Sequence, residues 1–323
     1  MIDPFGRTID YLRISVTDRC NERCLYCMPE GYKGWAQKAD HLSAAQLVAI
    51  AAAASRLGFR KFRLTGGEPL IRADFLDIAR GIGALPDLHS LGVSTNGLKL
   101  AALAGDLARA GVRSVNVSLD ALDPARYRRI TGGDLSAVLA GIRAAQAENL
   151  FVKLNCVLMR GVNEDDYRPL IHLSAELGAP LRFIELMPLS DSDVLTEKNF
   201  LSVAELRARL HAESPLEALS DYRPGHGPAR YWRDQASGAH LGFIGAITTP
   251  DFCASCNKLR LTADGKLRPC LGRHGELDLK SSLAAGESSA LDQLLARAVA
   301  EKPETHEFTD NYQPARPMTA IGG

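Results

Sequence analysis

The sequence predicts an α/β protein, a partial (β/α)6 TIM-like barrel followed by a C-terminal β-rich extension. Over the first two-thirds of the chain, short β-rich runs alternate with amphipathic helical runs, which is typical of βαβ units and a parallel sheet. The alternation stops after Pro188, and the region from about 226 to 271 is again rich in strand-forming residues. The 323 residues, 46% of them hydrophobic, suffice for one large or two medium domains.

The barrel strands are expected where β-branched and apolar residues run together. These runs are 11–17, 61–67, 91–96, 114–120, 152–159 and 181–188. Helical patterns lie between them at 43–58, 73–85, 100–110, 135–149 and 164–177. Ser43 begins the first helix with a capping-box pattern, and Gly58 ends it. Six such units are fewer than the eight of a complete barrel, so we expect a partial one.

The chain changes character beyond Pro188. Residues 189–200 are polar and irregular, and 202–213 follow a helical pattern. Two prolines and two glycines in 221–232 indicate a loop or a domain junction. A strand at 241–247 and a hairpin at 258–270, turning at Asp264-Gly265, are expected next. We therefore divide the chain into a barrel at 1–225 and an extension at 226–323.

Charge and hydropathy exclude several classes of protein. Lys plus Arg and Asp plus Glu each number 38, so no net field attracts nucleic acid or an anionic membrane. No stretch approaches the roughly 18–20 apolar residues of a membrane span, and no signal peptide is visible. We expect a cytoplasmic protein that binds neither nucleic acid nor membranes.

The seven cysteines are the most informative residues. An odd number without a secretion signal argues against a disulfide framework. Cys156 lies alone in an expected strand and is interpreted as an apolar core residue. The other six form two groups of three, Cys20, Cys24 and Cys27 near the start and Cys253, Cys256 and Cys270 near the end. Clustered thiols in a reducing compartment indicate metal.

Each trio is one ligand short of a closed four-coordinate site. A zinc site would need a distant fourth ligand, such as His41 or a later cysteine for the first trio. For the second trio, a zinc ribbon would need His226, His240 or His274. The alternative is a four-iron cluster at each trio, in which one iron keeps an open position for a small molecule. Spacing alone leaves both alternatives open.

Two motifs near the amino terminus resemble the radical S-adenosylmethionine superfamily. They are Cys-x3-Cys-x2-Cys with Tyr26 before the third cysteine, and Gly66-Gly67-Glu68-Pro69 after the second expected strand. Together with the second trio and the terminal Gly322-Gly323, the chain resembles the GTP 3′,8-cyclase family from about residue 5 to its end. Further segments that carry the resemblance are VSTNG, VNVSLDAL, VKLNCVLMRGVN and LRFIELM.

The resemblance implies a lyase that cyclises GTP to (8S)-3′,8-cyclo-7,8-dihydroguanosine 5′-triphosphate, the first step of molybdenum cofactor biosynthesis. It implies two [4Fe-4S] clusters and S-adenosyl-L-methionine as cofactors. The first cluster cleaves S-adenosylmethionine, the adenosyl radical removes the hydrogen at ribose C3′, and the second cluster binds guanine. Implied partners are GTP, a reductant protein, the downstream cyclic pyranopterin monophosphate synthase and a second copy of the chain in a homodimer.

The resemblance also assigns roles to residues. Tyr26, Gly67, Ser118 and Met187 are implied to contact S-adenosylmethionine, and Gly322 and Gly323 to reach into the site. The implied GTP contacts are Arg13, Arg63, Ser94, Lys153, Lys258 and Arg260. Three of these cations, Arg13, Arg63 and Lys153, lie in apolar strands, where a charge needs a partner or a cavity.

Two positions depart from the family pattern, and two other functions remain open. Ser94 stands where threonine is expected, and Lys258 where arginine is expected, which removes bidentate geometry but keeps the charge. One alternative function is another two-cluster radical enzyme, such as a peptide-modifying maturase. The other is a zinc-binding module without enzymatic activity.

Overall fold

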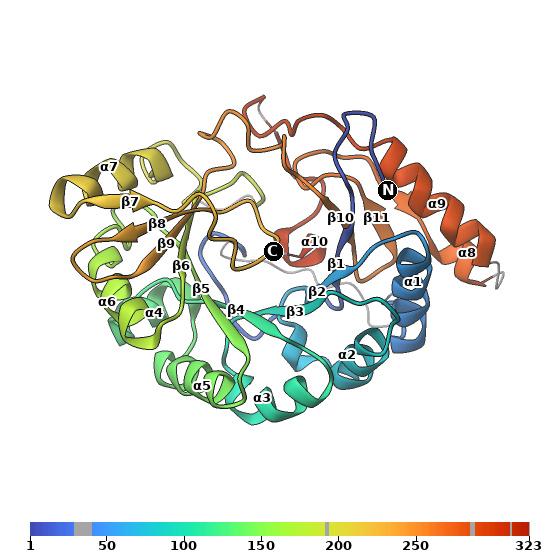
Figure 1. The fold of residues 1–323 in the computed structure, drawn as a ribbon, viewed down its shortest axis with the longest axis horizontal. Helices are drawn as coiled ribbons and strands as arrows, with labels where there is room; N and C mark the ends of the chain where they lie inside the picture. Colours follow the sequence, from blue (N-terminus) through green and yellow to red (C-terminus); the bar gives the residue numbers. More distant parts are fainter. Residues whose placement is uncertain (29–40, 191–193, 285–287, 311, 323) are drawn as a thin grey trace.

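One curved sheet organises the computed structural model, which describes all residues except 29–40, 191–193, 285–287, 311 and 323. Twelve strands lie in the order β12-β11-β10-β1-β2-β3-β4-β5-β6-β9-β8-β7. Figure 1 shows them curving around a central space, with helices on the outside. The predicted partial barrel with a C-terminal extension is confirmed.

Six parallel strands in chain order form the centre of the sheet. They are β1 (Tyr11–Ser15), β2 (Lys61–Thr65), β3 (Ser90–Thr95), β4 (Ser114–Ser118), β5 (Phe151–Val157) and β6 (Leu181–Ile184). All six coincide with the expected strands to within a few residues.

The outer helices follow the strands as expected. They are α1 (Ala44–Arg56), α2 (Phe75–Gly83), α3 (Leu100–Arg109), α4 (Pro124–Thr131), α5 (Leu135–Ala147) and α6 (Tyr167–Leu177), with a 3-10 turn at Pro69–Ile71. The capping box predicted at Ser43 is present. Helix α4 was not predicted, although Asp123 caps its start, Pro124 opens it and Gly132 ends it with φ 75°.

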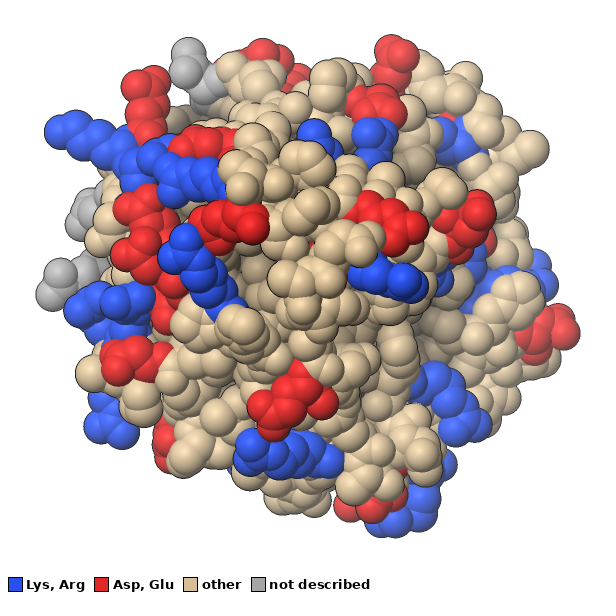
Figure 2. Space-filling view, turned by 60° about the vertical axis from the view of Figure 1, so that its left-hand side comes forward, with Lys and Arg blue, Asp and Glu red and all other residues tan. Residues whose placement is uncertain are grey.

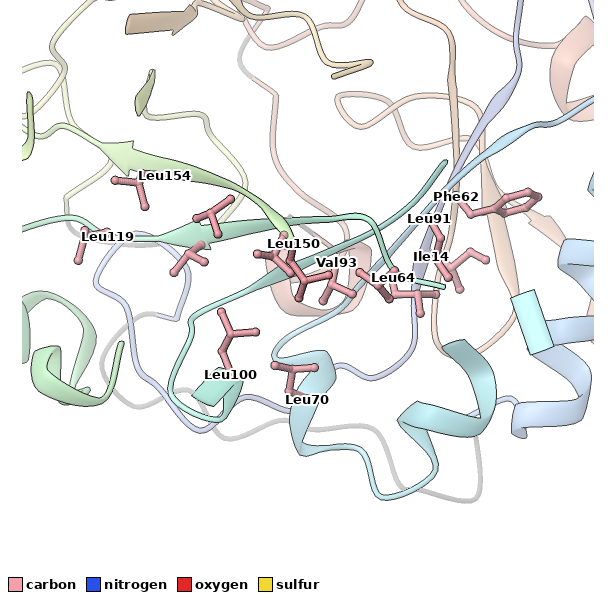
Figure 3. Packing of buried hydrophobic residues seen from close by; sticks show 14 of the residues in the cluster. Ile14, Phe62, Leu64, Leu70, Leu91, Val93, Leu100, Leu119, Leu150 and Leu154 are labelled. Atoms are coloured by element: carbon pink, nitrogen blue, oxygen red, sulfur yellow. The ribbon is translucent and has the colours of Figure 1, made fainter. Parts of the chain in front are cut away.

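The hydrophobic core lies between the sheet and the outer helices. Ile14, Leu64, Leu91 and Val93 are fully buried there, and Figure 3 shows such side chains between strands and helices. Successive strand residues point to opposite faces of a sheet. The neighbours of the core residues therefore face the central space, which explains why Arg13 lies between the buried Leu12 and Ile14 and lines a cavity.

The C-terminal extension adds strands to both edges of the barrel sheet. Strand β9 (His240–Ile244) runs parallel to β6, and β10 (Lys258–Leu261) runs parallel to β1. The remaining elements are α7 (Val203–Glu213), β7 (Leu216–Ala218), β8 (Arg230–Asp234), β11 (Lys266–Arg268), β12 (Leu277–Asp278), α8 (Lys280–Ala284), α9 (Ser288–Ala300) and α10 (Met318–Ile321). The predicted hairpin is the antiparallel pair β10–β11. The division at 225/226 falls in the loop between β7 and β8, which pair with each other.

Helix α10 lies in the middle of the fold. In Figure 1 it lies inside the ring of strands, beside β1. Among the described helices, none combines the length and apolar character that crossing a bilayer requires.

Candidate active site

A cavity of about 350 Å³ occupies the inside of the barrel. Every predicted site residue that the structure describes lines it except Gly322. They are Arg13, Cys20, Cys24, Tyr26, Cys27, Arg63, Gly67, Ser94, Ser118, Lys153, Met187, Cys253, Cys256, Lys258, Arg260 and Cys270. Gly323 lies outside the described residues.

The first trio lies in the loop that follows the carboxyl end of β1. The amides of Arg23 and Leu25 donate to carbonyls at the end of α4, and the Cys27 amide donates to the Cys24 carbonyl at 2.9 Å. The Tyr26 hydroxyl donates to Asp120 at 2.8 Å, and the Ser190 hydroxyl donates to the Tyr26 carbonyl at 2.8 Å. This loop is therefore tied to β4, α4 and the segment after β6.

The thiols of this loop fit a metal centre by their chemistry. Burial raises the pKa of Cys20 to about 12, and burial together with the Cys20 thiol raises the pKa of Cys27 to about 12. Burial, Glu22 and the neighbouring thiols raise the pKa of Cys24. Thiolates packed this closely need a cation to balance them. Among the described residues, no three His, Cys, Asp or Glu side chains converge on the position of a single ion. In an iron–sulfur cluster each thiolate binds its own iron, so a trio need not converge on one point.

The second trio lies at the opposite end of the barrel. Cys253 and Cys256 precede the amino end of β10, whereas the first trio follows the carboxyl end of β1, and the two strands are parallel neighbours. Cys270 follows β11, which runs antiparallel to β10 and so returns to the same end. Strand β1 has five residues, a length of about 17 Å. The cavity thus has one trio at each end.

Backbone groups hold the second trio and donate to its sulfurs. The amide of His306 donates to the Cys253 sulfur, and that of Lys258 donates to the Cys256 sulfur. Arg7 donates to the Cys253 carbonyl at 3.1 Å. Such N–H···S contacts are typical of iron–sulfur sites.

The histidines considered as fourth ligands make other contacts. His41 pairs with Asp18 at 3.0 Å, His240 packs on Tyr222, and His274 stacks on Tyr312. His226 lines the cavity with its ring edge toward Tyr11. A different histidine lies beside the second trio. In His306, Nε2 is 2.6 Å from the Ala246 carbonyl, and Nδ1 accepts from the Phe308 amide at 3.2 Å. Both ring nitrogens of His306 are therefore engaged.

Buried cations fill the middle of the cavity. In register, Arg260 lies beside Arg13, which lies beside Arg63 on β2. Burial and neighbouring cations lower the pKa of Arg13 to about 9, and the same causes lower the pKa of Lys153 to about 6. In the described part of the chain, no carboxylate forms an ion pair with Arg63, Lys153, Arg182, Lys258 or Arg260. Like charges kept together without acids indicate a site for a polyanion.

The outer surface differs from this interior. Figure 2 shows acidic and basic side chains interspersed over the visible face, in line with the zero net charge. The excess of cations is therefore a property of the cavity.

Arg63, one of the predicted GTP contacts, is held in place by three hydrogen bonds. It donates to the Tyr11 hydroxyl at 2.7 Å, the Val93 carbonyl at 2.9 Å and the Ser114 hydroxyl at 3.3 Å. Gly92 makes room for it, because a Cβ there would lie 2.6 Å from a guanidinium nitrogen. Gly67 likewise meets backbone, since a Cβ would lie 2.2 Å from the Arg19 carbonyl oxygen. Close packing against the cysteine loop thus requires glycine at position 67.

Among the lining residues that the sequence analysis did not identify, three have buried polar atoms without a partner in the described part of the chain. Arg182 on β6 is buried, hydrogen-bonds to Tyr231 and leaves Nε and Nη2 without a partner among the described residues. The side-chain oxygens of Asn116 and Asn155 are orphaned in the same way. Buried polar atoms without partners are rare in native proteins. The atoms of Arg182, Asn116 and Asn155 therefore indicate positions where a ligand would form hydrogen bonds. A charge in an apolar strand, the signal used for Arg13, would have found Arg182.

The C-terminal tail closes against the inner strands. Arg260 donates to the Gly322 carbonyl, and Met318 and Thr319 line the cavity. Gly322 has φ +77°, and a Cβ there would lie 2.7 Å from the Thr65 methyl group. Both observations require glycine at this position.

Comparisons with known proteins agree with these features. Residues 14–174 match the Radical SAM superfamily, and 179–308 match Molybdenum Cofactor Synthesis C. The chain is 43% identical to a protein of Rhodopseudomonas palustris (strain TIE-1) named GTP 3′,8-cyclase, over all of this chain and 96% of that one. It is 42% identical to the GTP 3′,8-cyclase of Moorella thermoacetica over the full length of both.

Solved structures show the same fold at low sequence identity. Streptococcus suis SuiB bound to the precursor peptide SuiA superposes with a TM-score of 0.65 at 14% identity. That match covers 90% of this chain and 65% of SuiB. SuiB bound to S-adenosylmethionine gives 0.63 at 13% identity over 85% of this chain and 64% of SuiB. The chain thus spans about two-thirds of SuiB, and the likeness concerns the fold alone.

Proposed function

Because the chain belongs to the GTP 3′,8-cyclase family of radical S-adenosylmethionine enzymes, we propose how its own residues carry out the reaction of that family. The protein is a lyase that cyclises GTP to (8S)-3′,8-cyclo-7,8-dihydroguanosine 5′-triphosphate in the first step of molybdenum cofactor biosynthesis. One observation carries the residue assignments: a single cavity joins both cysteine trios to the buried cations.

The two ends of the cavity have different tasks. Cys20, Cys24 and Cys27 would hold a [4Fe-4S] cluster that supplies the electron for cleavage of S-adenosylmethionine. Cys253, Cys256 and Cys270 would hold a second one that supplies a binding position for guanine. Both trios consist of thiols in the wall of the same cavity, which supports the pair of clusters.

S-adenosylmethionine is assigned to the end near the first trio. Tyr26, Gly67, Ser118 and Met187 contact it there. They lie on the cysteine loop or at the carboxyl ends of β2, β4 and β6, the end of a barrel where sites usually form. The Tyr26 ring is fixed by its hydrogen bond to Asp120, so its backbone is held for such a contact.

The triphosphate of GTP is assigned to the middle of the cavity. Its proposed contacts are Arg13, Arg63, Ser94, Lys153, Lys258 and Arg260, to which the structure leads us to add Arg182. Guanidinium groups suit phosphate oxygens because their donors form a planar fork. Burial and neighbouring cations disfavour the charged forms of Arg13, Lys153, Lys258 and Arg260. A bound polyanion would stabilise these charged forms by balancing their mutual repulsion.

The tail and the partners complete the proposal. The Gly322 carbonyl accepts from Arg260, one of the proposed triphosphate contacts, and Gly323 is proposed to act with Gly322 in the site. We propose a barrel domain at 1–225 and an auxiliary-cluster region at 226–323. We further propose that a reductant protein supplies electrons, that cyclic pyranopterin monophosphate synthase takes the product, and that a cytoplasmic homodimer is the working form.

Cysteine variants test the assignment of the two trios. Anaerobically reconstituted protein should hold about eight irons per chain, and Cys156→Ala should match it, because Cys156 lies outside the cavity wall. Cys24→Ala should lose about four irons and form no 5′-deoxyadenosine from S-adenosylmethionine. Cys256→Ala should also lose about four irons, still form 5′-deoxyadenosine, and leave GTP unchanged.

Specific results would contradict the assignment. If Cys24→Ala still forms 5′-deoxyadenosine, the first trio does not hold the cleaving cluster. If Cys256→Ala cyclises GTP at the rate of the parent, the second trio has no role at the substrate. Wild-type protein that cleaves S-adenosylmethionine but modifies a peptide in place of GTP would favour a maturase.

A further inference from the structure

Lys302 is a buried lysine close to the second trio. It follows α9, where its amide donates to the Val299 carbonyl, and its residue surface is only 3% exposed. Its side chain enters the wall of the cavity. A buried ammonium group requires partners for its charge and for its three N–H donors.

All three donors of Lys302 have acceptors, and they come from the segments that carry Cys256 and Cys270. Nζ lies 2.9 Å from the Lys258 carbonyl and 2.7 Å from the Pro269 carbonyl. Its third contact is a hydrogen bond to the Cys256 sulfur. Because Pro269 directly precedes Cys270, one side chain ties both segments of the second trio together.

The charge of Lys302 is directed at the Cys256 sulfur. Within the described residues, no carboxylate lies at ion-pairing distance from this ammonium group. Lys302 and Lys258 are the two cations whose charges act on this sulfur. Lys302 therefore places a positive charge beside a sulfur that would bind iron.

The first trio has the opposite surroundings. The Glu22 carboxylate lies 3.9 Å from the Cys24 sulfur, and the Asp120 carboxylate accepts from the Tyr26 hydroxyl of the same loop. Two carboxylates thus lie beside the loop of the first trio, whereas two ammonium groups lie beside Cys256 of the second trio. Hydrogen bonds to sulfur and the local charge are the properties through which a protein sets the reduction potential of an iron–sulfur cluster.

We propose that Lys302 is a positioning residue of the second iron–sulfur site, where it joins the Cys256 and Cys270 segments and raises the reduction potential of the cluster they hold. The proposal rests on the function proposed above. Reduction adds negative charge to a cluster, and a cation at a ligand sulfur stabilises the reduced form more than the oxidised form.

The test observes the second site by itself. Full-length Cys20→Ala/Cys24→Ala/Cys27→Ala protein should hold about four irons, all at the second trio. Lys302→Met, Lys302→Arg and the control Lys99→Met are added to this parent, since Lys99 is exposed and outside the cavity wall. Electron paramagnetic resonance at a fixed solution potential then gives the ratio of reduced to oxidised cluster.

Lys302→Met should lower this ratio about tenfold, equivalent to about 59 mV for a one-electron couple. Lys302→Arg and Lys99→Met should stay within about twofold of the parent, because Arg keeps the charge and Lys99 is remote. Should Lys302→Met lose its iron, Lys302→Gln replaces it, since an amide can still donate to the two carbonyls.

The outcomes separate the two proposals. A parent that holds zinc or no iron overturns the second cluster itself and this inference with it. A four-iron parent whose ratio is unchanged in Lys302→Met overturns the role of Lys302 alone. A shift in Lys302→Arg as large as that in Lys302→Met also overturns it, because the charge is then not responsible.

Discussion

Replacing Gly322 by alanine should expel the C-terminal tail from the barrel without unfolding the protein. The new Cβ would lie 2.7 Å from the methyl group of Thr65 on β2 and 3.3 Å from the Cβ of Ser15 on β1. Overpacking of this kind costs about 1–3 kcal/mol. The residue would also keep φ at +77°, which costs a non-glycine residue about 1–2 kcal/mol. The steric cost alone would lower the equilibrium ratio of docked to undocked tail by roughly 5–150-fold.

Hydrogen exchange of the amides in 318–322 measures docking directly, because exchange reports local opening. Gly6→Ala is a matched control, since Gly6 also has φ +77° but no atom lies within 4 Å of its Cβ position. It should lower global stability slightly and leave tail exchange unchanged. Thr65→Ser removes the clashing methyl group. The double variant Gly322→Ala/Thr65→Ser should therefore regain most of the exchange protection and of the GTP cyclisation that the steric clash removes.

Three results would contradict this reasoning. If tail exchange in Gly322→Ala matches that of the wild type, the tail is not packed against Thr65 as the structure shows. If Thr65→Ser restores nothing, the loss comes from backbone strain alone. Loss of cyclisation with a fully protected tail would mean that Gly322 acts by another route than docking.

Two further predictions concern stability. Burial, Arg63 and Arg182 lower the pKa of Lys153 to about 6, whereas the pKa of a lysine in the unfolded chain is about 10.4. Between about pH 6 and pH 10.4 the Lys153 side chain is therefore protonated in the unfolded state and neutral in the folded state. Over this range the stability of the wild-type protein rises with pH. Lys153→Met should therefore raise the melting temperature, more at about pH 6.5 than at about pH 9.5, and an equal gain at both would contradict the burial of this charge. Glu185 accepts from the amides of Val203, Ile247 and Thr248 and from the Thr248 hydroxyl, so Glu185→Gln should cost about 3 kcal/mol in urea unfolding. A loss below about 1 kcal/mol would show that this carboxylate is dispensable.

Local periodicity predicts most of the barrel because each strand and each outer helix carries its own pattern. Helix α4 escaped because its eight residues, Pro124–Thr131, include three arginines and few apolar residues. Only its caps, Asp123 and Gly132, gave a local signal. The pairing of β10 with β1 joins residues more than 240 positions apart, and no local pattern specifies such a partner. The extension was therefore expected to follow the barrel, whereas it completes both edges of the barrel sheet.

The residues of the cavity wall were predictable to the extent that their chemistry is unusual for their position. Arg13, Arg63 and Lys153 stand out as charges in apolar strands, and the cysteines stand out by spacing. Lys302 gives no such signal, because it follows a helix among other charged residues. Its importance depends on acceptors near Cys256 and Cys270 that only the folded chain brings to it.

The register of β10 against β1 determines whether this cavity exists. Tyr11 lies opposite Lys258 and Arg13 opposite Arg260, so both cations face the cavity while Leu259 and Leu261 are buried in the core. A slip by one residue would exchange the two faces of the strand. It would bury Lys258 and Arg260 among the core side chains and turn the two leucines toward the cavity.

Asn257 opposes such a slip. Its carbonyl accepts from the amides of Asp10 and Tyr11, and its side chain donates to Asp10 at 2.9 Å. Cys256 directly precedes Asn257, so the same contacts fix how far the second trio lies from the first. The pairing that aligns the cations therefore also sets the separation of the two cysteine trios. A change in that separation would displace Lys258 and Arg260 from the proposed phosphate site.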